Sequence, residues 1–529
     1  MIHIVLFFYS LFSFNSKHNL KNAHLMNNLH NKAPKRIPFC GFLSKFAPKN
    51  QKRQLMKRIL IPFAILFSAV MVCTSCLKSD DDDTVYYDDT AITTFTLGTL
   101  KRTVHTTSSK GADSTYTTTL TGSDYQFYID QEKREIYNPD SLPYGTDVAH
   151  VICTVTAKNG GVIALKSVTS DSLRYYSSTD SIDFSTPRQM VAYANSGKAY
   201  RAYTVHVNVH QEEGEVFNWS ERAAQSTLAG MKELKAVACN DHLYVFGQRD
   251  GYTVGYVTLL SDGSDFTPLA FNFKHRLEAD AYQNLLAQGN NLFLLDKEKL
   301  LRSTDGQEWI TVSAPHLTRL LAVSSLKLYG MDAEGNILSS ADNGTTWIEE
   351  PMGDEAIWLP QSSVSYACFT LKTNTDVERV IVTGNRDLTT WPNDGYAMVW
   401  GKLEDLSNPL QANEWTYYTP SDHSLYRLPS LANLSMFAYD DVLIAFGGSG
   451  VGACTESPFS TTYVSKDGGI TWKGSTLYPL PSTLKGSDIP HAAAVDSQWC
   501  LWIINGENGQ VWRGRLNRLG WKKIQKEFQ

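Results

Sequence analysis

The sequence predicts an all-β chain in which a β-sandwich is followed by a β-propeller. Three observations carry this prediction. Short β-branched segments that alternate apolar and polar residues fill residues 91–212, and none of them shows a helical period. All 12 tryptophans lie from Trp219 onward, so the composition changes between the two parts. Residues 216–529 then repeat a unit of strands and turns that ends in tryptophan, which is typical of a propeller.

The chain carries an apparent export signal ahead of the sandwich. The basic pair 57–58 precedes a short apolar run at 59–72 and then small residues, the pattern of a secretory signal that is too short to span a membrane comfortably. Residues 74–75 and Cys76 resemble the lipobox of bacterial lipoproteins, in which the cysteine thiol is acylated. The Ser-Asp-Asp-Asp-Asp run at 79–83 resembles the signal that sends Bacteroidota lipoproteins to the outer face of the outer membrane. These resemblances imply a lipid anchor at Cys76 in the outer membrane, with the protein facing the cell exterior.

The same signal sets the expected boundaries near the N-terminus. A signal peptide begins a translated chain, so we expect translation to begin at Met56 and residues 1–55 to be a spurious extension. A genuine cytoplasmic leader is the alternative. The expected order is then a lipoprotein signal peptide at 56–75, an acidic tether at 76–90 and the sandwich at 91–212.

The sandwich prediction rests on its strands and turns. Residues 92–97, 125–129 and 203–209 alternate apolar and polar side chains. Gly-Gly at 160–161 and Ser-Gly at 196–197 are hairpin signals. About seven strands with no helix pattern indicate a β-sandwich. The order of these segments resembles the Ig-like domain that opens many Bacteroidota surface lipoproteins, where it commonly acts as a spacer.

The propeller prediction rests on a repeated turn. Residues 340–347 and 465–472 both match Ser-x-Asp-x-Gly-x-Thr-Trp, and residues 303–309 show the same motif shortened by one residue. These segments resemble the Asp-box, or bacterial neuraminidase repeat, which joins the two outer strands of a propeller blade. Its Asp accepts hydrogen bonds from turn amides, its Gly takes a positive φ and its Trp packs between sheets. The implied structural positions are Ser303, Asp305, Trp309, Ser340, Asp342, Gly344, Trp347, Ser465, Asp467, Gly469 and Trp472.

The number of blades follows from the apolar stretches between these turns. Six such stretches predict a six-bladed propeller, with seven blades as the alternative, and residues 216–220 are expected to pair with the last blade and close the ring. Residues 242–247 and 442–448 also resemble Kelch-type blade strands. The six stretches are 236–246, 284–295, 320–331, 365–383, 434–446 and 492–504.

Composition excludes several classes of function. A net charge of -6 gives no reason to expect a nucleic-acid partner, since nucleic acid favours basic patches. The cysteines beyond Cys76 are scattered and contain no Cys-x-x-Cys pair, which argues against a disulfide framework and a structural zinc site. The sequence therefore predicts no cofactor and no metal site.

One insertion carries the candidate ligand-binding residues. It spans residues 386–396, inside the fourth blade, and contains Trp391, Asn393, Asp394 and Tyr396. Aromatic rings beside Asp and Asn side chains are what sugar rings stack on and hydrogen-bond to. The alternative for each tryptophan is a place in the core of a blade.

Arg427 is a second candidate for ligand binding. The segment 426–429, Tyr-Arg-Leu-Pro, resembles the Phe/Tyr-Arg-Ile-Pro segment of sialidases, in which the arginine grips a substrate carboxylate through a bidentate fork. Here Leu replaces Ile, and the segment lies late in the propeller instead of in its first blade. A sialidase also needs two further arginines, a tyrosine nucleophile and its carboxylate partners, which have no assignable positions in this sequence. No catalytic residue is predicted.

The tether and the sandwich contain possible O-glycosylation sites. Asp followed by Ser or Thr and then an aliphatic residue or Thr resembles the acceptor sequence of Bacteroidota, and a glycan there would stiffen the stalk. The matching positions are Thr84, Thr90, Ser114, Ser141, Ser172 and Ser181.

These observations together favour a non-enzymatic, surface-tethered propeller that binds an extracellular glycan or a protein partner. The main alternative is an exo-acting glycoside hydrolase of sialidase type. A structural partner of an outer-membrane assembly is a third class.

Overall fold

The computed structural model describes residues 85–107, 113–409, 411, 413–419 and 425–522. The expected signal peptide at 56–75, the lipid-bearing Cys76 and the candidate acceptor Thr84 lie outside the described residues. In the part of the chain that is described, no helix is both long enough and apolar enough to cross a membrane. Strands dominate, and the only helices described are short 3-10 turns, so the predicted all-β class is confirmed.

The N-terminal part contains three small sheets. Strands β1 (Ile92–Leu97) and β6 (Cys153–Ala157) pair antiparallel, and β2 (Thr99–Thr107) forms a hairpin with β3 (Asp113–Thr121). The third sheet has the order β4 (Tyr128–Asp130), β5 (Glu135–Tyr137), β10 (Tyr200–His206), β9 (Arg188–Tyr193), β7 (Val162–Lys166) and β8 (Leu173–Tyr175).

One hydrophobic core joins these N-terminal sheets. Phe95 on β1, Ile163 on β7 and Tyr203 on β10 are among its buried members. The burial pattern of β1 explains its contribution: Ile92, Phe95 and Leu97 are buried, while the residues between them are exposed. Phe95 and Leu97 share a face because successive side chains of a strand alternate, and a register shift between Ile92 and Thr94 lets Ile92 join the same core.

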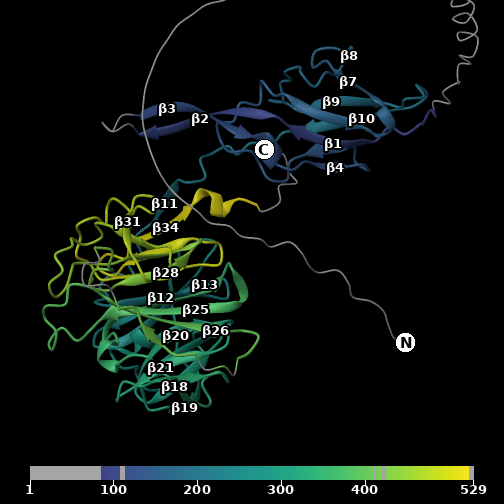
Figure 1. The fold of residues 1–529 in the computed structure, drawn as a ribbon. Coiled ribbons are helices and arrows are strands. Elements are labelled where there is room, and N and C mark those ends of the chain that lie inside the picture. Colours follow the sequence, from purple (N-terminus) through teal and green to yellow (C-terminus); the bar gives the residue numbers. More distant parts are fainter. Residues whose placement is uncertain (1–84, 108–112, 410, 412, 420–424, 523–529) are drawn as a thin grey trace, which may run out of the picture. The chain divides into compact units, whose positions relative to one another are not determined.

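The C-terminal part consists of six four-stranded antiparallel sheets (Figure 1). The innermost strands are β12 (Leu234–Cys239), β16 (Leu285–Gln288), β20 (Leu317–Val323), β24 (Ser362–Leu371), β28 (Ser435–Tyr439) and β32 (His491–Val495). The second strands are β13 (His242–Arg249), β17 (Asn291–Asp296), β21 (Leu328–Asp332), β25 (Asn374–Asn385), β29 (Val442–Phe446) and β33 (Leu501–Asn505). The third strands are β14 (Tyr252–Leu259), β18 (Lys299–Ser303), β22 (Ile337–Ser340), β26 (Met398–Asp405), β30 (Thr462–Ser465) and β34 (Val511–Leu516). The outermost strands are β15 (Thr267–Pro268), β19 (Ile310–Ser313), β23 (Ile348–Glu349), β27 (Thr416–Tyr417), β31 (Lys473–Ser475) and β11 (Phe217–Arg222).

The six sheets close into a ring. Each innermost strand contacts the next one, and β32 contacts β12. The closing sheet takes its outermost strand, β11, from the beginning of this part of the chain, and β11 pairs antiparallel with β34 from Phe217 opposite Leu516 to Arg222 opposite Val511 (Figure 1). This confirms the pairing predicted for residues 216–220, and β11 covers the edge of β34 that would otherwise be unpaired.

Apolar clusters fill the spaces between neighbouring sheets. Leu285 packs toward the sheet that precedes β16, and Leu286 packs toward the sheet that follows it. Successive side chains alternate between the two faces of a strand, so a sheet covered on both faces needs apolar residues at consecutive positions. This is why the inner strands read as continuous apolar runs in the sequence.

Three hairpins between third and outermost strands share one set of hydrogen bonds. In the turn from β22 to β23, Asp342 Oδ1 accepts hydrogen bonds from the amides of Thr345 (3.1 Å) and Thr346 (2.9 Å). The amide of Gly344, at φ +87, donates to Ser340 Oγ, and Trp347 Nε1 donates to the Gly344 carbonyl. The turn that contains Asp305 repeats these bonds, with Gly306 in the glycine position. The turn that contains Asp467 repeats them with Gly469, but its carboxylate accepts from one amide, that of Thr471.

Candidate functional site

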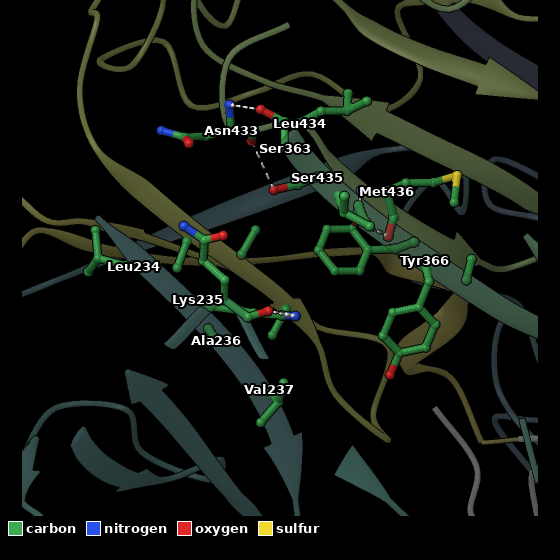
Figure 2. Close-up of a pocket in the computed structure, with 18 of the residues that line it drawn as sticks. Leu234, Lys235, Ala236, Val237, Ser363, Tyr366, Asn433, Leu434, Ser435 and Met436 are labelled. Atoms are coloured by element: carbon green, nitrogen blue, oxygen red, sulfur yellow. Dashed lines mark hydrogen bonds between the residues drawn. The ribbon is translucent and has the colours of Figure 1, made fainter. Parts of the chain in front are cut away.

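A cavity of about 730 Å³ lies at the centre of the ring. Its lining residues come from all six innermost strands and from the residues that directly precede them, such as Glu233, Gln283 and Gln361. The cavity therefore reaches the face on which the chain enters the innermost strands, which we call the entry face. Figure 2 shows Lys235 and its neighbours on β12 along one side of the cavity, and Ser363, with residues of β28, along another.

Two cations line this cavity. The Lys235 ammonium donates to the Gln283 carbonyl (2.8 Å), and the Arg319 guanidinium donates to the Gln361 carbonyl (2.7 Å). Burial, and then the nearby Arg319 guanidinium, lower the pKa of Lys235 to about 7. Burial also lowers the pKa of Arg319, against the attraction of Asp280. Each cation thus loses part of its hydration without gaining a close carboxylate.

The backbone at the entry face is irregular. Ser363 and Asn433 have φ values of 49, in the left-handed region that side chains other than Gly and Asn rarely adopt, and the Asn433 amide donates to Ser363 Oγ (3.0 Å). Register shifts interrupt β24 near Ser363 and β20 near Arg319. Such bulges re-aim side chains, and here they bring Arg319 and Ser363 to the cavity lining.

The insertion at 386–396 forms a second feature of the entry face. It joins β25 to β26, and in an antiparallel sheet the connection from the second to the third strand lies on the same side as the start of the first. Arg386 anchors it: Nε and Nη2 donate to the two Asp394 carboxylate oxygens at 2.7 and 2.8 Å. Its guanidinium lies between the rings of Trp358 (4.3 Å) and Trp391 (4.1 Å).

The candidate ligand-binding residues are only partly available for contact. Trp391 and Tyr396 are 36% and 39% exposed, and the Arg427 guanidinium stacks on the Tyr396 ring at 4.1 Å. Asn393 is exposed, whereas both carboxylate oxygens of Asp394 accept from Arg386. Trp391, Tyr396 and Arg427, which we call the aromatic platform, remain candidate ligand contacts together with Asn393, and Asp394 holds the loop in place.

A smaller cavity lies between the central cavity and the insertion at 386–396. It measures about 460 Å³ and is lined by Arg386, Asp387 and Trp391 together with residues around η5 (Ala356–Trp358). Gln361 lines this cavity as well as the central one, so the two are neighbours. Sequence reasoning missed Lys235, Arg319 and Arg386. The sequence does contain an indication of Lys235, because this residue is the only charged one in the otherwise apolar strand β12.

The remaining predicted positions lie elsewhere. None of the residues implied to be structural in the repeated turns lines either cavity, and the turns join third to outermost strands, on the face opposite the entry face. Among the possible glycosylation sites, Ser114, Ser172 and Ser181 are exposed. Thr90 and Ser141 are 7% and 3% exposed, which corrects the expectation for them, because a buried hydroxyl offers no surface to a glycan. In the described ranges, no three His, Cys, Asp or Glu side chains are grouped so that they would hold a metal ion.

The fold defines the class of this protein: an all-β chain with a β-propeller domain, an architecture that suggests a binding or scaffold role. The chain matches the DUF6242 beta propeller domain over residues 213–524 and the DUF6242 N-terminal domain over residues 95–207. It belongs to the DUF6242 family. No curated protein matches the chain.

The chain shows distant likeness to solved structures of different origin. YCF48 bound to D1 peptide has a TM-score of 0.33 at 14% identity, covering 56% of this chain and 94% of its own. The N-terminal domain of Nup159 has a TM-score of 0.30 at 12% identity, covering 58% and 98%. A Trichoderma reesei Carbohydrate-Active Enzymes Family AA12 structure has a TM-score of 0.35 at 9% identity, covering 57% and 96%. These likenesses carry no argument about ligand or activity.

Proposed function

We propose that this protein is a cell-surface lipoprotein whose propeller binds an extracellular glycan or protein partner without catalysis or a cofactor. In this proposal Cys76 carries the lipid in the outer membrane, the N-terminal domain is an Ig-like spacer, and the six sheets are the blades of a six-bladed propeller with Asp-box turns. The repeated turns then act as scaffold, because their polar groups are used within each hairpin.

The aromatic platform is the observation that carries the proposal. Trp391 and Tyr396 present more than a third of their surface to solvent, although tryptophan is usually well buried. The ion pair and the ring stacking of Arg386 fix the loop before any ligand arrives. A pre-organised aromatic surface loses less conformational entropy on binding than a mobile one, which suits the recognition of sugar rings.

The alternative, an exo-acting glycoside hydrolase of sialidase type, finds less support. Three arginines would have to converge on a substrate carboxylate, but the central cavity has one arginine in its lining, Arg319. Arg427 lines neither cavity and stacks on Tyr396 instead. Binding therefore agrees better with the geometry than hydrolysis does.

A glycan-array screen of the purified full chain tests the proposal. We expect reproducible binding to one glycan class, lost in Trp391→Ala and weakened in Arg427→Ala. Trp499→Ala is the matched control, because Trp499 is 38% exposed but lies in the connection between the first and second strands of its sheet, away from the entry face. Equal binding by Trp391→Ala and Trp499→Ala would refute a role for the platform. Absence of any glycan signal would shift the proposal to a protein partner.

A further inference from the structure

The two cations of the central cavity have no close carboxylate to neutralise them. Lys235 and Arg319 form no ion pair within 4.0 Å among the described residues, and they donate to the backbone carbonyls of Gln283 and Gln361. By contrast, the buried Lys402 and Lys327 of the same propeller are both paired with Glu350. A cation that lines a cavity and lacks a counter-ion is typical of a site that receives an anion.

The other ionisable groups leave a small positive charge in the cavity. Glu233 lines it and has its pKa raised by burial, against a hydrogen bond with Tyr282. Burial lowers the pKa of His491 to about 4, so its ring is neutral at pH 7. The lining thus holds two basic groups, Lys235 and Arg319, and one carboxyl group, Glu233, an excess of one basic group that a single negative charge on a ligand would balance.

The rest of the lining suits a small polar molecule. The volume, about 730 Å³, lies within the roughly 300–1,000 Å³ range of small-molecule pockets. Ser363, Ser365 and Ser435 line one part, and Tyr366 and Phe437 line another. The three hydroxyls each bond to the backbone of Asn433 or Met436, which fixes their positions. Hydroxyls that can donate or accept hydrogen bonds, beside rings that can pack, are the usual contacts of a hydroxylated carbon skeleton.

We infer that the central cavity is a binding site for a small hydroxylated molecule that carries one carboxylate, with Arg319 and Lys235 holding the carboxylate. The guanidinium uses one N–H on the Gln361 carbonyl and keeps further N–H groups for a two-pronged contact with the anion. This site is distinct from the aromatic platform and does not depend on it.

Isothermal titration calorimetry of the purified full chain with glucuronate, and with glucose as the neutral control, tests the site. We expect glucuronate to bind and glucose not to bind. Lys235→Met should weaken glucuronate binding about 30-fold or more, since it removes one partner of a buried charge contact. Arg319→Lys, which keeps the charge but loses the fork, should weaken it about tenfold. Lys232→Met is the matched control, because Lys232 is exposed and does not line the cavity.

Several outcomes would overturn the inference. These are equal binding of glucose and glucuronate, unchanged affinity in a folded Lys235→Met variant, or tighter binding of glucose 6-sulfate than of glucuronate. Loss of glucuronate binding in Trp391→Ala would also contradict a separate site. The platform test and the cavity test can thus fail independently.

A second measurement uses the unmodified protein and so does not depend on a variant that folds. Because the pKa of Lys235 is about 7, its amine is partly neutral at pH 7 and should react with acetic anhydride faster than exposed lysines. Mass spectrometry should show that glucuronate slows acetylation of Lys235, whereas glucose does not. Acetylation at the same rate with and without glucuronate would overturn the inference.

The site should also depend on pH. Arg319 acts directly on Lys235, and Asp280 acts on Arg319. The other titratable groups of the cavity lining are Glu233, Tyr282, Tyr366, Cys368 and His491. Of these, Tyr282 and His491 stay neutral near pH 7, since burial raises the pKa of Tyr282 to about 12 and lowers that of His491 to about 4. Glucuronate binds the protonated Lys235, so its affinity should fall as pH rises above about 7. Lys235→Met should remove this dependence, and its persistence in that variant would contradict the assignment.

Discussion

Replacing Lys402 by Met should destabilise the propeller by about 3 kcal/mol, at the lower end of the roughly 3–5 kcal/mol range for breaking a buried ion pair. Lys402 is 3% exposed, and its ammonium donates to the Glu350 carboxylate, which is 4% exposed. Glu350 also accepts from Lys327 (3.1 Å) and from Ser339. The cluster joins the sheet of β20–β23 to the sheet of β24–β27.

The expected magnitude follows from what the substitution leaves behind. Methionine keeps most of the apolar stem of lysine, so the main change is the lost charge. Glu350 stays buried and retains Lys327 and Ser339 as partners, which is why the lower end of the range applies. Although burial raises the pKa of Glu350, the hydrogen bond from Lys402 and its other contacts reverse this, and the net pKa is lowered. Combining Lys402→Met with Glu350→Leu should recover more than half of the loss, because the unpaired carboxylate is removed and Lys327 keeps Glu404, at 3.8 Å, as its counter-ion.

Urea unfolding followed by tryptophan fluorescence measures this effect. All 12 tryptophans lie from Trp219 onward, so the signal reports the propeller and not the N-terminal domain. Lys372→Met is the matched control: Lys372 is paired with Asp441, but the two side chains are 70% and 52% exposed, and the expected loss is below about 1 kcal/mol. A loss in Lys402→Met no larger than in Lys372→Met, at an unchanged denaturant slope, would refute the reasoning.

Three further predictions concern the turns and the platform. Hydrogen bonds from the backbone and side chain of Thr346 are the main reason that the pKa of Asp342 is lowered to about 2. The stability that this carboxylate contributes is therefore present above pH 4 and is lost as pH falls toward 2. In a series of urea midpoints measured against pH, Asp342→Asn should flatten this part of the curve. Gly344→Ala should destabilise the protein by about 2 kcal/mol or more in urea unfolding, since an added Cβ at φ +87 would lie 2.1 Å from a leucine side chain. The control Gly251→Ala, at φ +80 in open space, should cost about 1 kcal/mol. Equal losses in the two variants would exclude the steric cause. Arg386→Met should abolish glycan-array binding while leaving glucuronate titration unchanged, and a variant that retains full array binding would show that the platform does not need this anchor.

Local chemistry explains what the sequence predicts well. The turn that contains Asp342 is built from hydrogen bonds between residues no more than four positions apart, so a short motif is enough to recognise it. The strands that alternate or run continuously apolar are likewise local patterns, because the two faces of a strand follow from a period of two residues. The pairing of residues 216–220 with the last sheet could be predicted because an unpaired edge strand is unfavourable in any propeller.

The sites required the tertiary structure. Lys235 and Arg319 stand 84 positions apart in the chain, and only closure of the ring brings the strands that bear them to one cavity. Trp358 and Trp391 come from separate loops, and nothing in either loop alone indicates that Arg386 would lie between them. The burial of Thr90 and Ser141 has the same origin, because exposure depends on which segments pack over a residue.

The sequence by itself therefore determined the all-β class, the repeated turns and the closure of the ring, since these follow from hydrogen bonds and side-chain alternation over a few residues. The tertiary structure alone decided which charges remain without a partner. A side chain's counter-ions are set by distances across the ring, and the free energy of a buried charge depends on those distances and on the water that packing excludes.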